Sequence, residues 1–335
     1  MQRMDILLAD AKLSRGRHRM KGRVSEHRLG HSLQAAMARQ SPKRVVKSKV
    51  EVVKAPAWQQ WPWLLHGFST RTGGVSTAYR PGQRSGELNL GLTASDPREN
   101  VLTNRQCFLS AVTGGEGGFV VLKQVHSSWI RRVGKEDIGQ EARWKADGMM
   151  TDEPGVLLAI QTADCIPVLV ADVKKKAVAG FHAGWRGTVE RIVEQGIGRM
   201  RLEFRSRPED LVAAIGPGIG ACCYAVGEEV RGEFESQFAY AGNLFSEVYD
   251  SDPVKEKYPL LFLTARAPGH SHLGPSLHLD LMEANRRQLL DAGLSQEAIT
   301  VIGDCTSCQR DRYFSYRAER GFTGRMFSAI GIRSK

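Results

Sequence analysis

Short apolar runs, separated by polar and glycine-rich turns, mark most of the chain beyond its first fifty residues. Runs of strand length lie at 119–125, 156–160, 166–171, 177–181, 211–215, 299–302 and 326–332. Between Val189 and Met200 the apolar residues recur with a helical period instead. A second amphipathic helix is predicted over 281–289, with Asp280 as its N-cap.

The order of these elements predicts a single mixed α/β domain. Strands and helices alternate, but several strands follow one another directly, which disfavours a regular doubly wound sheet. We expect residues 56–335 to form this domain and residues 1–55 to be an N-terminal extension. No stretch approaches the ~18 uninterrupted apolar residues of a spanning helix, so we expect no membrane partner.

The net charge of +11 belongs to the extension rather than to the domain. Residues 1–50 hold thirteen of the 47 Lys and Arg residues but only three of the 36 Asp and Glu residues. The remainder is almost neutral, which gives no support for a nucleic-acid-binding fold. We interpret the basic segment as a flexible, solvated arm, with a targeting peptide or a later start at Met20 or Met37 as open alternatives.

Six cysteines in 335 residues are too few for a disulfide scaffold and favour a reducing, cytoplasmic setting. Cys305 and Cys308 form a CxxC pair without a second pair at the spacing of a zinc ribbon. We therefore predict a structural role for this pair, and we interpret Cys222 and Cys223 as buried small residues.

Three segments place metal-binding side chains at the ends of predicted strands. They contain His126, Cys165 and His182. One thiolate and two imidazoles suit Zn²⁺ and leave a fourth tetrahedral position open, as in catalytic zinc sites. Separations of 39 and 17 residues carry no metal signature, so core roles for the same residues stay open.

A series of motifs resembles the YfiH/laccase-domain family, also called the multicopper polyphenol oxidase or purine nucleoside phosphorylase family. The motifs lie, in order, at 66–76, 88–90, 123–126, 146–152, 162–167, 182–187, 214–227, 305–306, 314–317 and 323–326. The resemblance covers roughly residues 60–333 and leaves the basic extension outside.

The resemblance implies a compact α/β sandwich, likened to cysteine hydrolases of the deamidating-toxin type. It implies phosphorolysis of adenosine, inosine, guanosine and methylthioadenosine, with adenosine deamination as a side activity. The family's metal ligands fall on His126, Cys165 and His182, for one Zn²⁺ that Cu²⁺ can replace. Purine nucleosides and phosphate are then the expected partners. No pattern fixes the oligomeric state, and a monomer is the working expectation.

The chemistry of these reactions suggests further site residues. Arginine binds phosphate through two parallel N–H donors, which makes Arg71 and Arg325, beside turn glycines, the candidates for phosphate binding. Asn89 is a candidate for contact with the ribose or for fixing its loop. Asp164 adjoins Cys165 and is the candidate proton shuttle. Salt bridges and turn capping are the structural alternatives for these residues.

Three other functions remain open. A copper-dependent polyphenol oxidase is disfavoured because nine histidines include only one His-x-His pair, His270 and His272. A hydrolase would use Cys165 as nucleophile and His182 as base. A non-enzymatic protein would use the basic extension to contact a partner.

Deletion of residues 1–55 separates the enzymatic from the non-enzymatic interpretation. We expect nucleoside turnover by the purified protein to survive the deletion, because the motifs lie outside the extension. Absence of turnover from both forms, together with loss of a bound partner from the shorter one, would contradict the enzymatic interpretation.

Overall fold

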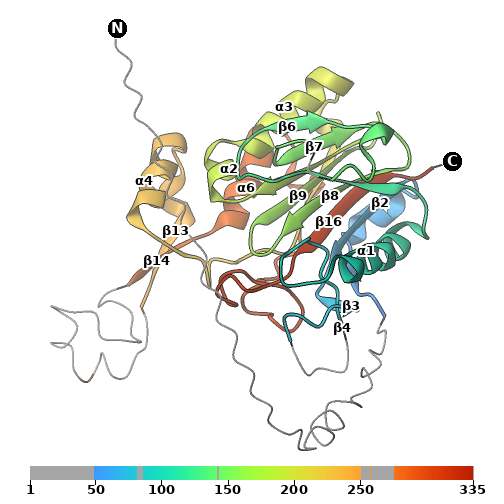
Figure 1. Ribbon diagram of the computed structural model, residues 1–335. Coiled ribbons are helices and arrows are strands. Elements are labelled where there is room, and N and C mark those ends of the chain that lie inside the picture. The colour runs from blue at the N-terminus through green and yellow to red at the C-terminus, as the bar shows by residue number, and fades with distance from the viewer. Residues whose placement is uncertain (1–48, 81–85, 142, 250–256, 258–274, 335) are drawn as a thin grey trace, which may run out of the picture. The chain divides into compact units, whose positions relative to one another are not determined.

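The computed structural model describes residues 49–80, 86–141, 143–249, 257 and 275–334 (Figure 1). Most of the predicted extension and the pair His270 and His272 therefore lie outside the described residues. The first described strand, β1 (Val52–Val53), pairs with β2 (Leu64–Ser69). Deletion of residues 1–55 would therefore remove β1, and a truncation that leaves β1 in place has to end before Val52.

Two mixed sheets form the framework of the described chain. The five-stranded sheet has the order β1, β2, β16 (Met326–Ile332), β8 (Val156–Thr162), β5 (Gly118–Val121). The six-stranded sheet has the order β15 (Ile299–Val301), β11 (Leu211–Ile215), β9 (Ile166–Asp172), β10 (Ala177–Ala183), β7 (Gly148–Thr151), β6 (Ile130–Arg132). Most neighbours are antiparallel, and the pairs β5–β8, β6–β7 and β11–β15 are parallel.

Two smaller sheets accompany them. One consists of β12 (Ala225–Val226), β14 (Ser276–Leu279) and β13 (Phe245–Val248), and the other of β3 (Thr72–Gly74) and β4 (Gly86–Glu87). In Figure 1, β13 and β14 lie beside α4 (Glu228–Gln237), at a distance from the strands of the large sheets.

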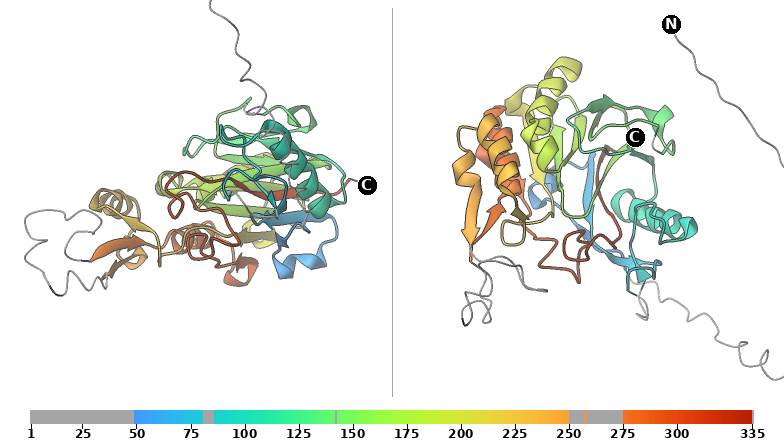
Figure 2. Two further views of the ribbon diagram at one scale, coloured as in Figure 1. Left: turned by 60° about the horizontal axis from the view of Figure 1, so that its bottom comes forward. Right: turned by 60° about the vertical axis from the view of Figure 1, so that its left-hand side comes forward.

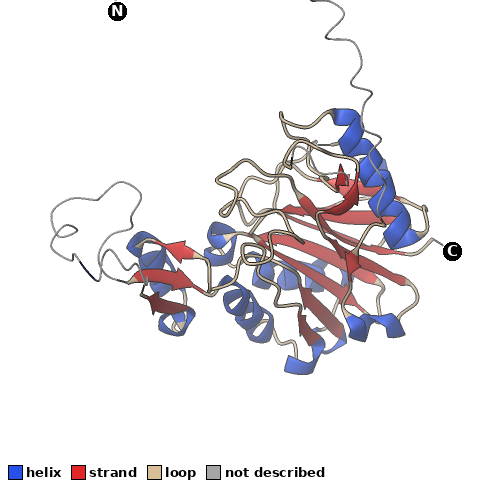
Figure 3. Ribbon diagram, turned by 90° about the horizontal axis from the view of Figure 1, so that it is seen from below, coloured by secondary structure: helices blue, strands red, loops and turns tan. Residues whose placement is uncertain are grey.

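The large sheets pack face to face, and helices cover their outer faces. Helices α2 (Trp185–Val189), α3 (Ile192–Phe204) and α6 (Leu281–Asp291) lie on the six-stranded sheet, and α1 (Arg98–Thr113) lies on the five-stranded sheet. The right-hand view of Figure 2 shows these layers, and Figure 3 shows helices flanking the strands. The described helices lack the length and hydropathy needed to cross a membrane.

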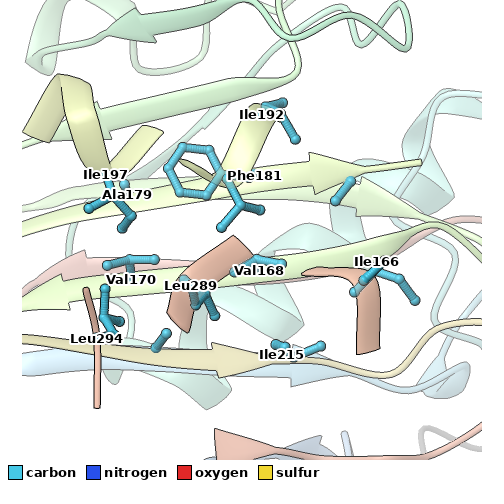
Figure 4. Close-up of a cluster of buried hydrophobic side chains, with 14 of the residues drawn as sticks. Ile166, Val168, Val170, Ala179, Phe181, Ile192, Ile197, Ile215, Leu289 and Leu294 are labelled. Atoms are coloured by element: carbon cyan, nitrogen blue, oxygen red, sulfur yellow. The ribbon is translucent and has the colours of Figure 1, made fainter. Parts of the chain in front are cut away.

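Burial on both faces explains the near-continuous apolar runs in the sequence. Along β9, Val168 and Val170 face the helices, whereas Leu169 and Ala171 face the other sheet. Figure 4 shows the helix side of this core around Phe181. A Cβ atom at Gly196 of α3 would lie 2.2 Å from the Phe181 ring, so glycine permits this close approach of helix to sheet.

The helices largely follow the predicted periods. Helix α6 begins after Asp280, whose carboxylate accepts a hydrogen bond from the Glu283 N–H at 2.9 Å, as predicted. The period that starts at Val189 is divided between two helices, because Arg191 has a positive φ of 59°. The prediction of one continuous helix from Val189 to Met200 is therefore wrong.

His66 of β2 makes stability depend on pH. Its Nε2 accepts a hydrogen bond from the Ala55 N–H at 3.0 Å. Burial, aided by the charge of Lys54, lowers the pKa of His66 from 6.5 to about 4. The folded state thus favours the neutral ring, and its stability is complete above the unfolded pKa and declines as the pH falls from 6.5 towards 4.

We expect His66→Gln to remove this decline, because the amide oxygen can accept the same hydrogen bond without titrating. Between pH 7 and pH 4 the wild-type protein should lose on the order of 3 kcal/mol more unfolding free energy than the variant. Urea denaturation at both pH values measures the difference. Parallel declines in the two proteins would show that His66 does not titrate in this range.

Candidate active site

The structure brings together the three predicted metal-binding side chains. His126 follows β5, Cys165 lies in the turn between β8 and β9, and His182 lies on β10. One donor atom of each residue lies within 4.8 Å of the others, and the Cys165 Sγ is 4.0 Å from the His126 Nε2. The two imidazole rings meet edge to face, with centroids 4.9 Å apart.

Strand pairing explains why distant residues meet here. In the β9–β10 hairpin His182 lies opposite Pro167, which places the Cys165 turn beside the end of β10. Gly184 follows immediately, and a Cβ atom there would approach the Cys165 Sγ to 3.1 Å and the His126 ring to 3.2 Å. Glycine at this position leaves room for the three donors to converge.

A buried carboxylate orients the His182 ring and fixes the backbone at His126. Asp147 lies 2.8 Å from His182 Nδ1 and accepts hydrogen bonds from the N–H groups of Val125, His126 and Ser127 at 2.7 to 3.2 Å. Burial raises the pKa of Asp147, but His182 and Ser127 outweigh it and lower the pKa to about 2. The bond to Nδ1 leaves Nε2 of His182 free to bind a metal ion, as in carboxylate–histidine–metal arrangements.

The donor set suits a soft or borderline cation. Burial raises the pKa of Cys165, but His182 and His126 outweigh burial and lower the pKa to about 6. Burial lowers the pKa of His182, whereas Cys165 and Asp147 raise it, to about 9 overall. The thiol therefore ionises readily, as both a metal ligand and a nucleophile require. Three converging N and S donors with a carboxylate behind them fit Zn²⁺.

A cavity of about 860 Å³ opens beside the three donors. Its positive side chains are Arg105, Lys123, Arg186, Arg317 and Arg325, and its negative ones are Glu141 and Asp164. Arg105 and Glu141 form an ion pair with each other. The remaining charges leave an excess of cations, which suits an anionic ligand.

Arg325 is the predicted arginine that lines this cavity. Its Nη1 donates to the carbonyl oxygens of Thr323 and Gly324 at 3.0 and 2.9 Å, which holds the guanidinium in place. Among the described residues, its Nε and Nη2 have no hydrogen-bond acceptor. They are thus available to a ligand in the cavity.

The structure corrects the interpretation of Arg71. This residue is 1% exposed and does not line the cavity. Its guanidinium binds Glu87 and Glu319, donates to the Arg310 and Tyr313 carbonyls, and lies over the Phe314 ring. These contacts engage all three of its nitrogens, so Arg71 is a buried structural ion-pair partner rather than a phosphate ligand.

Asn89 also lies outside the cavity and is fully buried. Its amide donates to Asp96 and to the Gly91 carbonyl, and its oxygen accepts the Arg325 N–H at 2.8 Å. It therefore fixes its loop and the backbone of Arg325, which corrects the prediction of a ribose contact.

Asp164 lines the cavity but is held by its neighbours. One carboxylate oxygen accepts the Thr306 hydroxyl at 2.7 Å and the other accepts the Arg317 N–H at 2.6 Å. Its φ of 93° is unusual for a non-glycine residue, and His126 also has a positive φ, 60°. Such strained backbone is concentrated at functional sites. These contacts favour a positioning role for Asp164 and leave the proton-shuttle role a prediction.

The residues that line the cavity and that sequence reasoning missed include Arg186, Tyr224, Tyr316 and Arg317. All four lie in motifs noted from the sequence, which was the available signal. Asp147 also lies in one of these motifs, and the structure makes it the residue that orients His182.

A family model described as "Multi-copper polyphenol oxidoreductase laccase" matches residues 65–333. "Purine nucleoside phosphorylase YlmD" of Geobacillus stearothermophilus is 34% identical over 284 residues, 82% of this chain and 95% of that protein. A "Purine nucleoside phosphorylase" of Deinococcus radiodurans is 37% identical over 267 residues, 80% and 88% of the two chains.

Solved structures agree with these sequence matches. The crystal structure of YlmD from Geobacillus stearothermophilus gives a TM-score of 0.66 at 33% identity, covering 84% of this chain and 94% of that chain. The match confirms the predicted mixed α/β fold, and the family model confirms the resemblance carried by the sequence motifs.

We expect Cys165→Ala to reduce the metal content of the purified protein by one divalent ion per chain, because two imidazoles alone bind zinc weakly. Asp147→Asn should lower the metal affinity of the same site about 10- to 100-fold through the orientation of His182. Elemental analysis and competition with a chromogenic chelator measure these effects. Cys107→Ser, at a half-buried cysteine of α1, is the matched control, and an unchanged metal content in Cys165→Ala would contradict the ligand role.

Proposed function

Because this chain belongs to the multi-copper polyphenol oxidoreductase laccase family, we propose that it is a purine nucleoside phosphorylase with an adenosine deaminase side activity. The observation that carries the proposal is a cavity that combines the Cys165, His126 and His182 donor set with an excess of cationic side chains. The names of its relatives support the phosphorylase activity.

The size and lining of the cavity suit a nucleoside together with phosphate. About 860 Å³ lies within the range of small-molecule sites. The rings of Trp185, Tyr224 and Tyr316 line the cavity and offer surfaces on which a purine can stack. We assign the phosphate to Arg325, with Arg317 and Arg186 completing the positive surface around it.

In phosphorolysis an oxygen of hydrogen phosphate bonds to C1′ of the ribose as the bond from C1′ to the purine nitrogen breaks. The electron pair of that bond leaves with the base, which gains the proton lost by the phosphate. Arginine side chains hold the dianion against the developing positive charge on the ribose. Asn89 contributes indirectly, because it fixes the backbone of Arg325.

Deamination uses the same cavity without phosphate, as water replaces the amino group at C6 of adenine and ammonia leaves. A Zn²⁺ ion bound by His126, Cys165 and His182 would supply Lewis-acid chemistry there. Asp147 keeps His182 oriented, and Asp164 is the proposed proton shuttle. With these roles Cys165, His182 and Asp164 are the proposed catalytic residues, and we expect the enzyme to act in the cytoplasm.

Two alternative activities use parts of the same site. A hydrolase would use Cys165 as the nucleophile beside His182, with no need for a metal. Copper-dependent phenol oxidation needs several histidine-bound coppers, but the mixed cluster at this cavity contains only two histidines among the described residues. Cu²⁺ would still compete with Zn²⁺ for those nitrogens.

The direct test supplies the purified protein with adenosine and phosphate and follows ribose-1-phosphate, adenine and inosine separately. We expect ribose-1-phosphate and adenine to form in equal amounts, with inosine as a minor product. Turnover should be lost in Cys165→Ala. Removal of the metal should abolish turnover by itself, without alkylation of the protein. If no ribose-1-phosphate forms from any purine nucleoside, the phosphorylase proposal is wrong.

Arg325→Gln separates the two reactions. Loss of a charge-assisted contact should raise the KM for phosphate about 10- to 100-fold, whereas phosphate-independent deamination should change little. Arg132→Gln, at an exposed arginine in surface ion pairs, is the matched control and should alter neither reaction. Equal losses in both reactions would place Arg325 outside the phosphate subsite.

A further inference from the structure

Four cysteines outside the proposed active site come together in one cluster. Cys222 and Cys223 follow β11, and Cys305 and Cys308 follow β15. All four Sγ atoms lie within 4.8 Å of one another, and the Cys308 Sγ is 3.4 Å from the Sγ atoms of both Cys222 and Cys223. All four are free thiols.

Backbone contacts bring the two cysteine pairs together. Gly218 and Cys305 form a parallel bridge, and the Thr306 N–H donates to the Gly218 carbonyl at 2.9 Å. Each pair then lies in a tight turn, closed by a hydrogen bond from Cys223 N–H to Gly220 O and from Gln309 N–H to Cys305 O. The fold therefore brings both cysteine pairs to the same point.

The cluster has the size of a tetrahedral thiolate site. At a zinc–sulfur distance of about 2.3 Å, the edges of a tetrahedron of sulfurs are about 3.8 Å long. Two of the observed separations are 3.4 Å and all are within 4.8 Å, which is compatible with this length. A disulfide accounts for two of the four cysteines only, and it requires sulfurs about 2 Å apart.

The surroundings of Cys305 fit a metal-bound thiolate. The Gly220 N–H points at the Cys305 Sγ at 3.2 Å, and a hydrogen bond to sulfur favours its charged form. A Cβ atom at Gly220 would lie 3.3 Å from the Cys222 Sγ and from the Cys305 Cβ. Glycine there allows the first turn to fold closely around the second.

We propose that Cys222, Cys223, Cys305 and Cys308 bind one Zn²⁺ ion in a closed structural site. Four thiolates complete the tetrahedron, so this ion has no open position for a substrate, in contrast to the site at Cys165. Binding replaces the thiol protons, which pass to solvent, and no change of oxidation state is involved. The CxxC pair has the spacing of a structural zinc site, and its partner is the adjacent pair rather than a second CxxC.

The ion would join two loops that form part of the cavity wall. The first loop contributes Ile219 and Tyr224 to the cavity, and the second contributes Tyr316 and Arg317. Both loops also hold Asp164, through the Ile219 N–H at 2.7 Å and the Thr306 hydroxyl at 2.7 Å. The ligands of the two sites do not overlap, so this inference does not depend on the proposed activity.

The test uses the full chain with Cys165→Ala, so that the first site contributes no thiolate. Purified under reducing conditions without added metal, this protein should retain one Zn²⁺ per chain. After replacement of the ion by Co²⁺ it should show intense thiolate-to-metal charge-transfer absorption. Addition of Cys308→Ser should remove the retained Zn²⁺ and most of this absorption, whereas addition of Cys107→Ser should change neither.

A second measurement does not depend on the folding of the Cys308 variant. In the Cys165→Ala protein the four thiols should resist alkylation, and a strong chelator should expose all of them and lower the Tm. Failure of this protein to contain or take up Zn²⁺ would overturn the proposal. So would a disulfide among the four cysteines under the same reducing conditions, because it would identify a redox pair instead.

Discussion

The carboxylate of Asp147 is the contact on which the geometry of the site depends. It is fully buried immediately before β7, and it binds a ring nitrogen of His182 and three successive backbone N–H groups of the loop that carries His126. One side chain thus sets the orientation of a strand residue and the path of a loop. Without it, His126 would rest on a loop with a positive φ and no fixed relation to His182. Burial alone would neutralise such a carboxylate, and the histidine and N–H groups are what keep it charged.

The sequence predicts those strands and helices whose local pattern of residues is compatible with one type of secondary structure only. Strands β8, β9 and β10 are buried on both faces, so their apolar runs are unambiguous, and Asp280 caps α6 as its residue type suggests. The division between α2 and α3 was not predictable, since it follows from the left-handed conformation of one arginine, Arg191. The meeting of His126, Cys165 and His182 depends on strand register, which their spacing does not encode. Only the resemblance to a family indicated it.

The errors share one physical cause, because a residue type does not specify the side chain's partner. An arginine beside turn glycines has the same sequence signature whether it faces phosphate or, like Arg71, two buried glutamates. Cys222 is exposed and Cys223 is half-buried, which corrects the expectation that both are buried small residues. Cys222 and Cys308 lie 86 positions apart, and only the pairing of β11 with β15 brings the cluster together. Tertiary pairing, rather than motif spacing, decides both cases.

The position of β16 has a consequence for how the molecule is made. This strand comes last in the described chain, yet it lies in the middle of the five-stranded sheet, between β2 and β8. During synthesis β2 and β8 emerge long before β16 does. The strand that pairs with both of them is therefore missing until residue 332 has left the ribosome. Pairing across such a separation in sequence is entropically slow. Until then the unpaired edges of β2 and β8 can associate with other nascent chains.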